Sequence, residues 1–249
     1  MEISLIYMYI GFLLAAYSVI ANDSIQTLGT FLASNKAHFK WYTLWIAASL
    51  MMVFTISYGW VNYNGDIAYG RLTRIPFQEV QWYHAMAPAV LLLLTRKGIP
   101  VSTTFLVLSA FASFTVLEKV LMKSIVGYGV AAISAYVIWV VLERYINEKK
   151  DHPEHVKFWR VGQWVTSGWL WFAWLQHDMA NIAVFLPRQL MLGDLLMVLV
   201  ATVAILGYVF YTGGGRIQEV VINKHGTRFA RSSTIINLVY AFILYFFKE

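Results

Sequence analysis

The sequence predicts an all-α, polytopic membrane protein with about seven or eight transmembrane segments, some of them broken, as in inverted-repeat transporters. Hydrophobic residues make up 59% of the 249 positions, charged residues only 13%, and the mean hydropathy is +0.60. This composition is far too apolar for a soluble domain. Apolar runs of membrane length follow one another with polar connections between them. There is no cysteine, so disulfides and thiolate chemistry are excluded.

The first apolar run carries a carboxylate inside the predicted membrane region. Between Ile3 and Asn35 the only charged residue is Asp23. A straight helix of that length would reach roughly 50 Å, whereas the hydrocarbon core is about 30 Å thick. We therefore expect the run to break or re-enter at Asn22-Asp23, where polar neighbours can satisfy freed backbone groups. An acid at that depth is costly and is by default a candidate functional residue.

Later segments are predicted from their apolar length and their polar boundaries. Trp41 to Val61 is one clear span. After an extramembrane connection over 62–77, Val80 to Leu94 forms another helix, with Pro88 as a kink and His84 as an interfacial anchor. Further apolar helices are expected over 105–117, 124–142, 189–211 and 233–247, with a turn at 118–123 and a glycine turn at 213–216.

A strongly polar loop, residues 143–160, divides the chain into a first membrane repeat, 1–142, and a partial second one, 161–249. Basic residues concentrate in cytoplasmic loops, which favours a cytoplasmic position for this segment. The formal net charge of +6 has the same explanation. We expect no nucleic-acid partner, because the basic residues lie between apolar runs and not on one polar face.

The second half repeats the opening pattern. Val161 to Leu186 is a long apolar run, and Gln176-His177-Asp178-Met179-Ala180-Asn181 interrupts it. Again a lone acid lies inside a segment of membrane length. Interrupted hydrophobic segments at corresponding places in two halves are typical of transporters built from inverted repeats, with the site near the membrane midplane.

Three segments resemble, in order and approximate spacing, motifs of the inorganic phosphate transporter family, which are sodium- or proton-coupled phosphate permeases with some sulfate relatives. Ala21-Asn22-Asp23 through Thr30 resembles the family's asparagine-aspartate signature. Pro100-Val101-Ser102-Thr103-Thr104 is similar to its Pro-Val-Ser-Thr-Thr-His motif. His177-Asp178-Met179-Ala180-Asn181 is similar to its second Asn-Asp-Val-Ala-Asn motif, and the resemblance covers most of residues 10 to 245.

The resemblance implies a transport site shared by the two halves. Asp23 and Asp178 become the acids that hold a coupling metal ion, sodium, or carry a proton instead. Amides would support the acids and hydroxyls would face the anion: Asn22, Gln26 and Asn181 in the cation site, and Ser102, Thr103 and Thr104 in the substrate site. Hard oxygen ligands suit sodium, and N–H groups at a helix start suit an anion. No other cofactor and no catalytic residue is implied.

The sequence departs from the family pattern at several places. Gln26 stands where the family has asparagine, Phe105 replaces the histidine, and His177 displaces the asparagine of the second motif. The family repeats the Pro-Ser-Thr-Thr segment in its second half, and no such repeat follows here before Glu249. We therefore expect a short, divergent member with an incomplete second repeat, whose substrate site either is completed by a second copy in a homodimer or does not work in the family's way.

Particular residues argue against two other classes of membrane protein, retinal photoreceptors and membrane enzymes. A retinal photoreceptor needs a lysine near the middle of its last helix, and 233–247 contains none. A membrane enzyme needs converging catalytic groups, whereas His38, His84 and His177 are scattered, so we expect no enzyme. Both aspartates also have a structural alternative, as helix caps or as polar contacts between helices.

The sequence thus predicts a secondary transporter of the plasma (cytoplasmic) membrane. It would sit in the lipid bilayer and move inorganic phosphate, or sulfate, together with sodium or a proton. The alternative is a non-transporting, phosphate-binding or regulatory membrane protein derived from such a transporter. Convergence of Asp23, Asp178 and Ser102 to within roughly 10 Å would indicate one shared site, because charges at that separation still interact appreciably.

Overall fold

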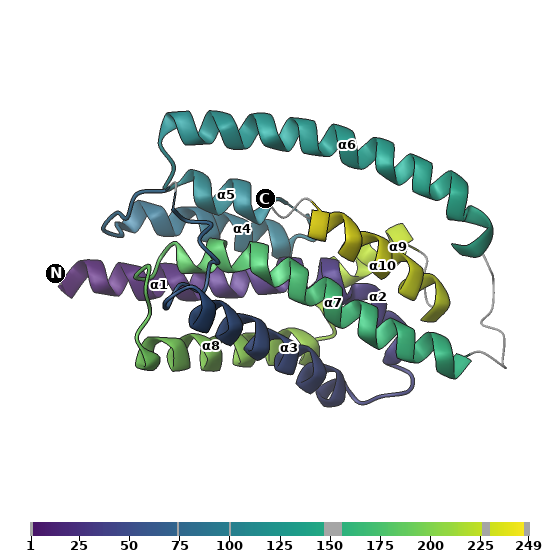
Figure 1. Cartoon of the computed structure of the whole chain (residues 1–249). Helices are drawn as coiled ribbons and strands as arrows, with labels where there is room; N and C mark the ends of the chain where they lie inside the picture. Colours follow the sequence, from purple (N-terminus) through teal and green to yellow (C-terminus); the bar gives the residue numbers. More distant parts are fainter. Residues whose placement is uncertain (1, 74, 100, 147–155, 226–229, 247–249) are drawn as a thin grey trace.

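The computed structural model describes residues 2–73, 75–99, 101–146, 156–225 and 230–246, and these residues form a bundle of helices without strands (Figure 1). The predicted all-α class is therefore confirmed. In chain order the elements are α1 (Glu2–Val19), the π-helical turn η1 (Ile20–Ser24), α2 (Ile25–Asn35), α3 (Trp41–Asn62), the 3-10 turn η2 (Trp82–Ala85), α4 (Met86–Arg96), α5 (Thr103–Ser109), α6 (Phe114–Ile146), α7 (Val156–Ala183), α8 (Leu192–Tyr211), α9 (Gly215–His225) and α10 (Ala230–Phe246).

Three segments of the described chain are long and apolar enough to cross a membrane: Ile3–Asn35, Trp41–Asn62 and Leu192–Tyr211. The helices α4, α5 and α9 have 11, 7 and 11 residues. At about 1.5 Å per residue none of these three reaches across a hydrocarbon core of about 30 Å. The protein is thus a helical, membrane-embedded one, and seven or eight full spans are not confirmed.

The opening segment does not break, so the expected interruption at Asn22-Asp23 is wrong. α1, η1 and α2 form one continuous helical segment. A π-helical turn accommodates an extra residue without ending the helix, and such turns are frequent at functional sites. Inside the widened turn the Thr27 hydroxyl donates to the backbone oxygen of Asp23 (2.7 Å), which satisfies a carbonyl group near the irregularity.

α7 packs antiparallel to this opening segment. Near one end the Phe185 ring lies against Gly11, where a Cβ would have no room. Near the other end Asn35 Nδ2 donates to Gln163 Oε1 (2.8 Å). α7 also runs uninterrupted through residues 176–181, the second place where the sequence predicted a break. The two acid-bearing helices therefore cross with opposite directions.

α3 and α8 form a second antiparallel pair. Trp45, near the start of α3, donates from Nε1 to the backbone oxygen of Val203 (3.1 Å). Trp60, near its end, donates to the backbone oxygen of Leu190 (2.8 Å), just before α8 begins. An indole bond from Trp171 to the backbone oxygen of Ala48 (3.2 Å) ties α7 to α3, so the two pairs share one core.

α10 and α5 both run parallel to α7. The Thr234 hydroxyl donates to the backbone oxygen of Trp159 (3.0 Å), and the rings of Trp169 and Phe242 lie 5.0 Å apart, so α10 runs parallel to α7. α5 also runs parallel to α7, because its start contacts Asn181 and the residues after it contact Phe185. Opposite directions are thus seen for the opening segment with α7 and for α3 with α8.

The connection between α3 and α4 is folded onto the bundle and is not a simple extramembrane loop. Ile67, Ala68 and Leu72 are buried. The Asp66 carboxylate accepts from the backbone N–H groups of Ala68 (2.7 Å) and Gly70 (2.8 Å), which fixes a tight turn. Of the predicted connection, only Arg74 lies outside the described residues.

Three local predictions in the first half are wrong. Pro88 lies in the first turn of α4, where a helix leaves N–H groups unpaired in any case, so it does not kink the helix. His84 is buried instead of interfacial: its Nδ1 accepts from the backbone N–H of Gln81 (2.9 Å), and its ring stacks on Phe111 at 4.3 Å. Residues 118–123 lie inside α6 and do not form a turn.

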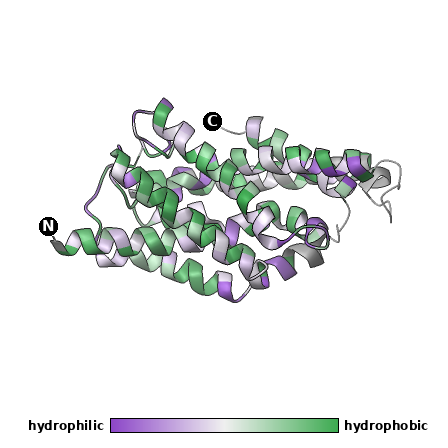
Figure 2. Ribbon diagram, turned by 90° about the horizontal axis from the view of Figure 1, so that it is seen from below, coloured by the Kyte–Doolittle hydropathy of each residue, from purple (hydrophilic) through white to green (hydrophobic). Residues whose placement is uncertain are grey.

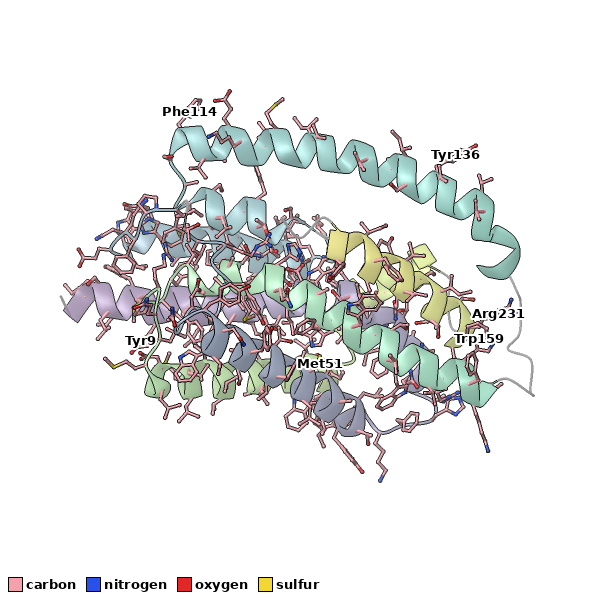
Figure 3. All side chains as sticks on the ribbon, in the orientation of Figure 1. Tyr9, Met51, Phe114, Tyr136, Trp159 and Arg231 are labelled. Atoms are coloured by element: carbon pink, nitrogen blue, oxygen red, sulfur yellow. The ribbon has the colours of Figure 1, made fainter. Side chains whose placement is uncertain are left out.

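α6 lies along the outside of the bundle (Figure 1). Phe114 and Tyr136 point away from it (Figure 3) and are 82% and 72% exposed. Figure 2 shows hydrophobic residues along the outer helices and hydrophilic ones gathered towards the loops and helix ends, as a bilayer requires. Of the predicted polar loop, residues 147–155 lie outside the described residues, while 143–146 and 156–160 are helical.

The glycine turn after α8 is confirmed. Gly213, Gly214 and Gly215 have φ values of 68°, 82° and 57°, a conformation that favours glycine. The turn leads into α9, which packs along α2. The site described below lies where the opening segment, α5 and α7 come together.

Candidate functional site

The two aspartates meet at the crossing of the opening segment with α7. Asp23 lies on η1 and Asp178 on α7, and each is only 4% exposed. Their carboxyl groups are within hydrogen-bonding distance of each other. Two carboxyl groups this close in an apolar surrounding need a shared proton or a cation between them, because two adjacent negative charges repel strongly there.

Three donors converge on Asp23. Asn22 Nδ2 donates to its Oδ1 (2.7 Å), and the Thr103 hydroxyl donates to its Oδ2 (2.8 Å). Gln26 Nε2 lies at 3.5 Å from Oδ1, at the limit of a hydrogen bond. Because a π-helical turn has more residues per turn than an α-helix, the side chains of Asn22 and Asp23 diverge less and can meet.

The start of α5 faces the acid pair. The Ser102 hydroxyl accepts from the backbone N–H of Phe105 (3.3 Å) and so caps the start of α5. This bond makes Ser102 a cap and leaves Thr103 as the residue that contacts the acids. Asn22 Nδ2 also donates to the backbone oxygen of Val101 (3.1 Å), which holds the start of α5 against η1. Pro100, the first residue of this motif, lies outside the described residues.

Asn181 links the second half of the chain to the same point. It lies almost one turn after Asp178 on α7, and its Nδ2 donates to the hydroxyls of Thr103 (3.1 Å) and Thr104 (3.2 Å). The Thr103 hydroxyl therefore accepts from one half and donates to the carboxylate of the other. The expected convergence is found, because Asp23 contacts both Asp178 and the chain neighbour of Ser102.

Two buried amide oxygens at the site have no hydrogen-bond partner among the described residues: Asn22 Oδ1 and Asn181 Oδ1. Both side chains are fully buried, and both use their nitrogen within the site. Buried oxygens without donors are rare and call for an explanation. Two such oxygens beside two carboxyl groups form an acceptor-rich environment that fits a small, hard cation.

Sequence reasoning missed two residues of the site, Trp174 and Arg71. The Trp174 side chain, one turn before Asp178 on α7, hydrogen bonds to the Asp178 carboxyl group. Arg71 lies in the connection between α3 and α4 and interacts electrostatically with Asp178. Partial burial lowers the pKa of the Arg71 guanidinium, and the negative charge of Asp178 opposes this shift. The apolar residues Ile67, Leu72 and Ile75 around it were the available signal that this connection packs inward.

The structure brings together six of the eight residues predicted for the site by direct hydrogen bonds or carboxyl contacts. These are Asn22, Asp23, Thr103, Thr104, Asp178 and Asn181. Gln26 lies at the edge, and Ser102 acts as a cap.

Comparisons of the chain with family models, with curated proteins and with solved structures give no match. The resemblance to the inorganic phosphate transporter family therefore stays a prediction that the three sequence motifs carry.

Proposed function

We propose that the protein is a secondary transporter that moves inorganic phosphate, or sulfate, across the plasma (cytoplasmic) membrane together with sodium or a proton. The observation that carries this proposal is the contact between Asp23 and Asp178 at the crossing of two antiparallel helices, with two unpartnered amide oxygens beside it. Buried acids within membrane helices are expensive and typically mark ion pathways.

Cation binding would change the charge of the site and free donors for the anion. Without a cation, the Thr103 hydroxyl donates to Asp23, and the positive charge of Arg71 acts on Asp178 electrostatically. A sodium ion or a proton between the two carboxyl groups would satisfy both acids. The Thr103 hydroxyl and the Arg71 guanidinium would then be available to donate to a tetrahedral oxyanion, so cation binding would favour anion binding.

The helix directions support a transporter with a partial inverted repeat. The opening segment and α7 run in opposite directions, as do α3 and α8, and the acids lie where the first pair crosses. Two inverted units around a fixed central site can rock against each other to give alternating access. The acid pair itself forms within one chain, from η1 and α7.

A second candidate function is a non-transporting membrane protein that binds phosphate or regulates a permease. The observation that favours it is that the hydroxyls predicted to bind the substrate already form hydrogen bonds within the protein. Ser102 caps α5, and the Thr103 hydroxyl is bonded to Asp23 and Asn181. Fewer hydroxyls are therefore free for an anion in this conformation.

Uptake of labelled phosphate by cells without their own phosphate importers tests the proposal. The unmodified protein is compared with Asp23→Asn and Asp178→Asn at matched membrane expression, and with Glu79→Gln, which removes an exposed acid outside the site. We expect uptake that depends on sodium or on a proton gradient, is lost in both aspartate variants and is kept in Glu79→Gln. No uptake by well-expressed unmodified protein, with phosphate binding to the purified protein, would favour the second candidate.

A further inference from the structure

A row of buried polar side chains leads from the acid pair towards one end of the molecule. On α2, Thr27, Thr30 and Ser34 follow Asp23 at spacings of four, three and four residues, so they share one face of the helix. α7 and α10 add polar side chains opposite this face. We call these residues the polar row: Thr30, Ser34, Gln163, Ser167, Ser233 and Asn237.

Hydrogen bonds connect neighbouring members of the polar row. The Ser233 hydroxyl donates to Thr30 Oγ1 (3.0 Å), and the Thr30 hydroxyl lies 3.3 Å from Asn237 Oδ1. Asn237 Nδ2 donates to Ser167 Oγ (2.8 Å). Further along, Gln163 Nε2 donates to the Ser34 hydroxyl. Such bonds between membrane helices ordinarily act as isolated pairs that hold helices together, whereas here they succeed one another along one crossing.

An acceptor without a donor lies beside this row. Gln218 on α9 is 7% exposed, and its Nε2 donates to the backbone oxygen of Gly29 (2.9 Å), next to Thr30. Its Oε1 has no partner among the described residues, like Asn22 Oδ1 and Asn181 Oδ1 in the site. In all three amides the atom without a hydrogen-bond partner is the oxygen, whereas the nitrogen donates a hydrogen bond. Oxygens in this position favour a cation over an anion.

The other side of the acid pair is mostly apolar; its buried hydroxyl, Ser18, donates to the backbone oxygen of Pro88 (2.9 Å). Ala15 and Phe12 on α1 are 0% and 1% exposed. The Phe185 ring lies against Gly11 and in edge contact with Phe111, with ring centres 5.0 Å apart. We call Phe12, Phe111 and Phe185 the aromatic plug. A cation would find few oxygen ligands here, so the two directions away from the acids are chemically unequal.

The polar row ends where the charge of the molecule indicates the cytoplasm. Beyond Asn35 the loop residues Lys36, His38 and Lys40 are exposed, and residues 36–42 line an open hollow of about 440 Å³. The same end carries the start of α7, where the Arg231 guanidinium lies 5.5 Å from the centre of the Trp159 ring (Figure 3). Basic residues at one end favour a cytoplasmic position, and water and salt screen their repulsion of a cation.

We propose that the polar row is the path along which the coupling cation, sodium or a proton, passes between the acid pair and the cytoplasm. The aromatic plug closes the opposite direction in this conformation. This inference rests on the proposed function, because it assigns a route to the cation of that same site. The hydroxyl and amide oxygens of the row provide successive ligands for sodium or successive partners for water that carries a proton.

Silver ions test this path, because Ag⁺ is close to sodium in size and reacts with thiols. The natural chain has no cysteine, so each variant carries a single thiol. Ser233→Cys places it in the polar row, and Ala15→Cys places it on the apolar side; both residues are 0% exposed, so they form a matched pair. His38→Cys marks the side of the loop. Oriented membrane vesicles receive Ag⁺ from one side, and unreacted thiols are counted after denaturation.

We expect Ser233→Cys to react about tenfold faster than Ala15→Cys, and only from the side where His38→Cys reacts. A buried thiol away from any path reacts only after local unfolding, which costs free energy, whereas a thiol on the path does not need that step. Excess sodium or acidic buffer should slow the reaction. Equal rates for the two buried thiols, or reaction of Ser233→Cys from the opposite side, would overturn the path. Asn237→Cys repeats the test at a second position of the row.

The labelling needs no phosphate, so it separates the two proposals. Slow labelling in a protein with normal coupled uptake would overturn the path and leave the transporter. Fast, one-sided labelling in a protein without uptake would support a cation path to the acid pair and count against phosphate transport.

Discussion

The two sides of the acid pair differ in chemistry, because α10 joins the opening segment and α7 on one side only. On one side of the acids the interface contains hydroxyls and amides, with Ser233, Asn237 and Gln163 almost fully buried. On the other side it contains Phe12, Ala15 and Phe185. The named residues on both sides are buried, so the two sides differ in polarity and not in exposure.

The largest effect is expected from the acids that separate the two sides. Asp178→Asn keeps the shape of the side chain but removes one of the two charges that a cation would neutralise. We expect coupled uptake to fall by about 100-fold, since a charge-assisted ligand contributes about 1.5–3 kcal/mol. Initial rates of labelled phosphate uptake over a range of sodium concentration and pH measure this. Unchanged rates would show that Asp178 has only a structural role.

The next effect is expected from opening the apolar side. Phe185→Ala removes the ring that contacts Gly11 and Phe111. The cavity should lower the free energy of unfolding by about 3 kcal/mol. In a protein that stays folded, Ala15→Cys should then react with silver nearly as fast as Ser233→Cys. Thermal unfolding in detergent and the labelling rate measure the two consequences, and an unchanged rate for Ala15→Cys would contradict the role of the plug.

A moderate effect is expected from making the polar side apolar. Asn237→Leu removes the bonds to Ser167 and Thr30 while it keeps a similar volume. We expect the maximal rate of uptake to fall about tenfold with little change in phosphate KM, because the change lies on the cation path and away from the start of α5. Stability should change by only about 1 kcal/mol. A raised phosphate KM with an unchanged maximal rate would speak against this assignment.

The smallest effect is expected away from both sides. Trp45→Phe removes one hydrogen bond to the backbone of α8, between helices that do not line the crossing. Unfolding should become easier by about 1 kcal/mol, and uptake per folded molecule should not change. Thermal unfolding together with uptake at matched expression checks this. A loss of uptake would mean that the α3–α8 pair takes part in transport directly.

Local patterns predicted several parts of this structure correctly. Trp41–Val61 and Gln189–Tyr211 were recognised as helices because an apolar run of membrane length has few other solutions. The glycine turn at 213–216 was recognised because consecutive glycines are a local turn signal. Where neighbouring side chains compete, local patterns were insufficient: His84 looked interfacial beside Trp82, yet its ring is buried on Phe111, which is distant in sequence.

The sequence by itself determined a helical membrane protein with two buried acids, because apolar length and the cost of a charge in lipid are properties of each segment alone. It did not determine that η1 would carry the helix through Asp23 without a break, that Arg71 would come near enough to influence Asp178 electrostatically, or that α10 would run parallel to α7. Those features depend on which segments pack together. Only the tertiary structure could decide them, since the partners of a buried polar group are supplied by helices far away in the chain.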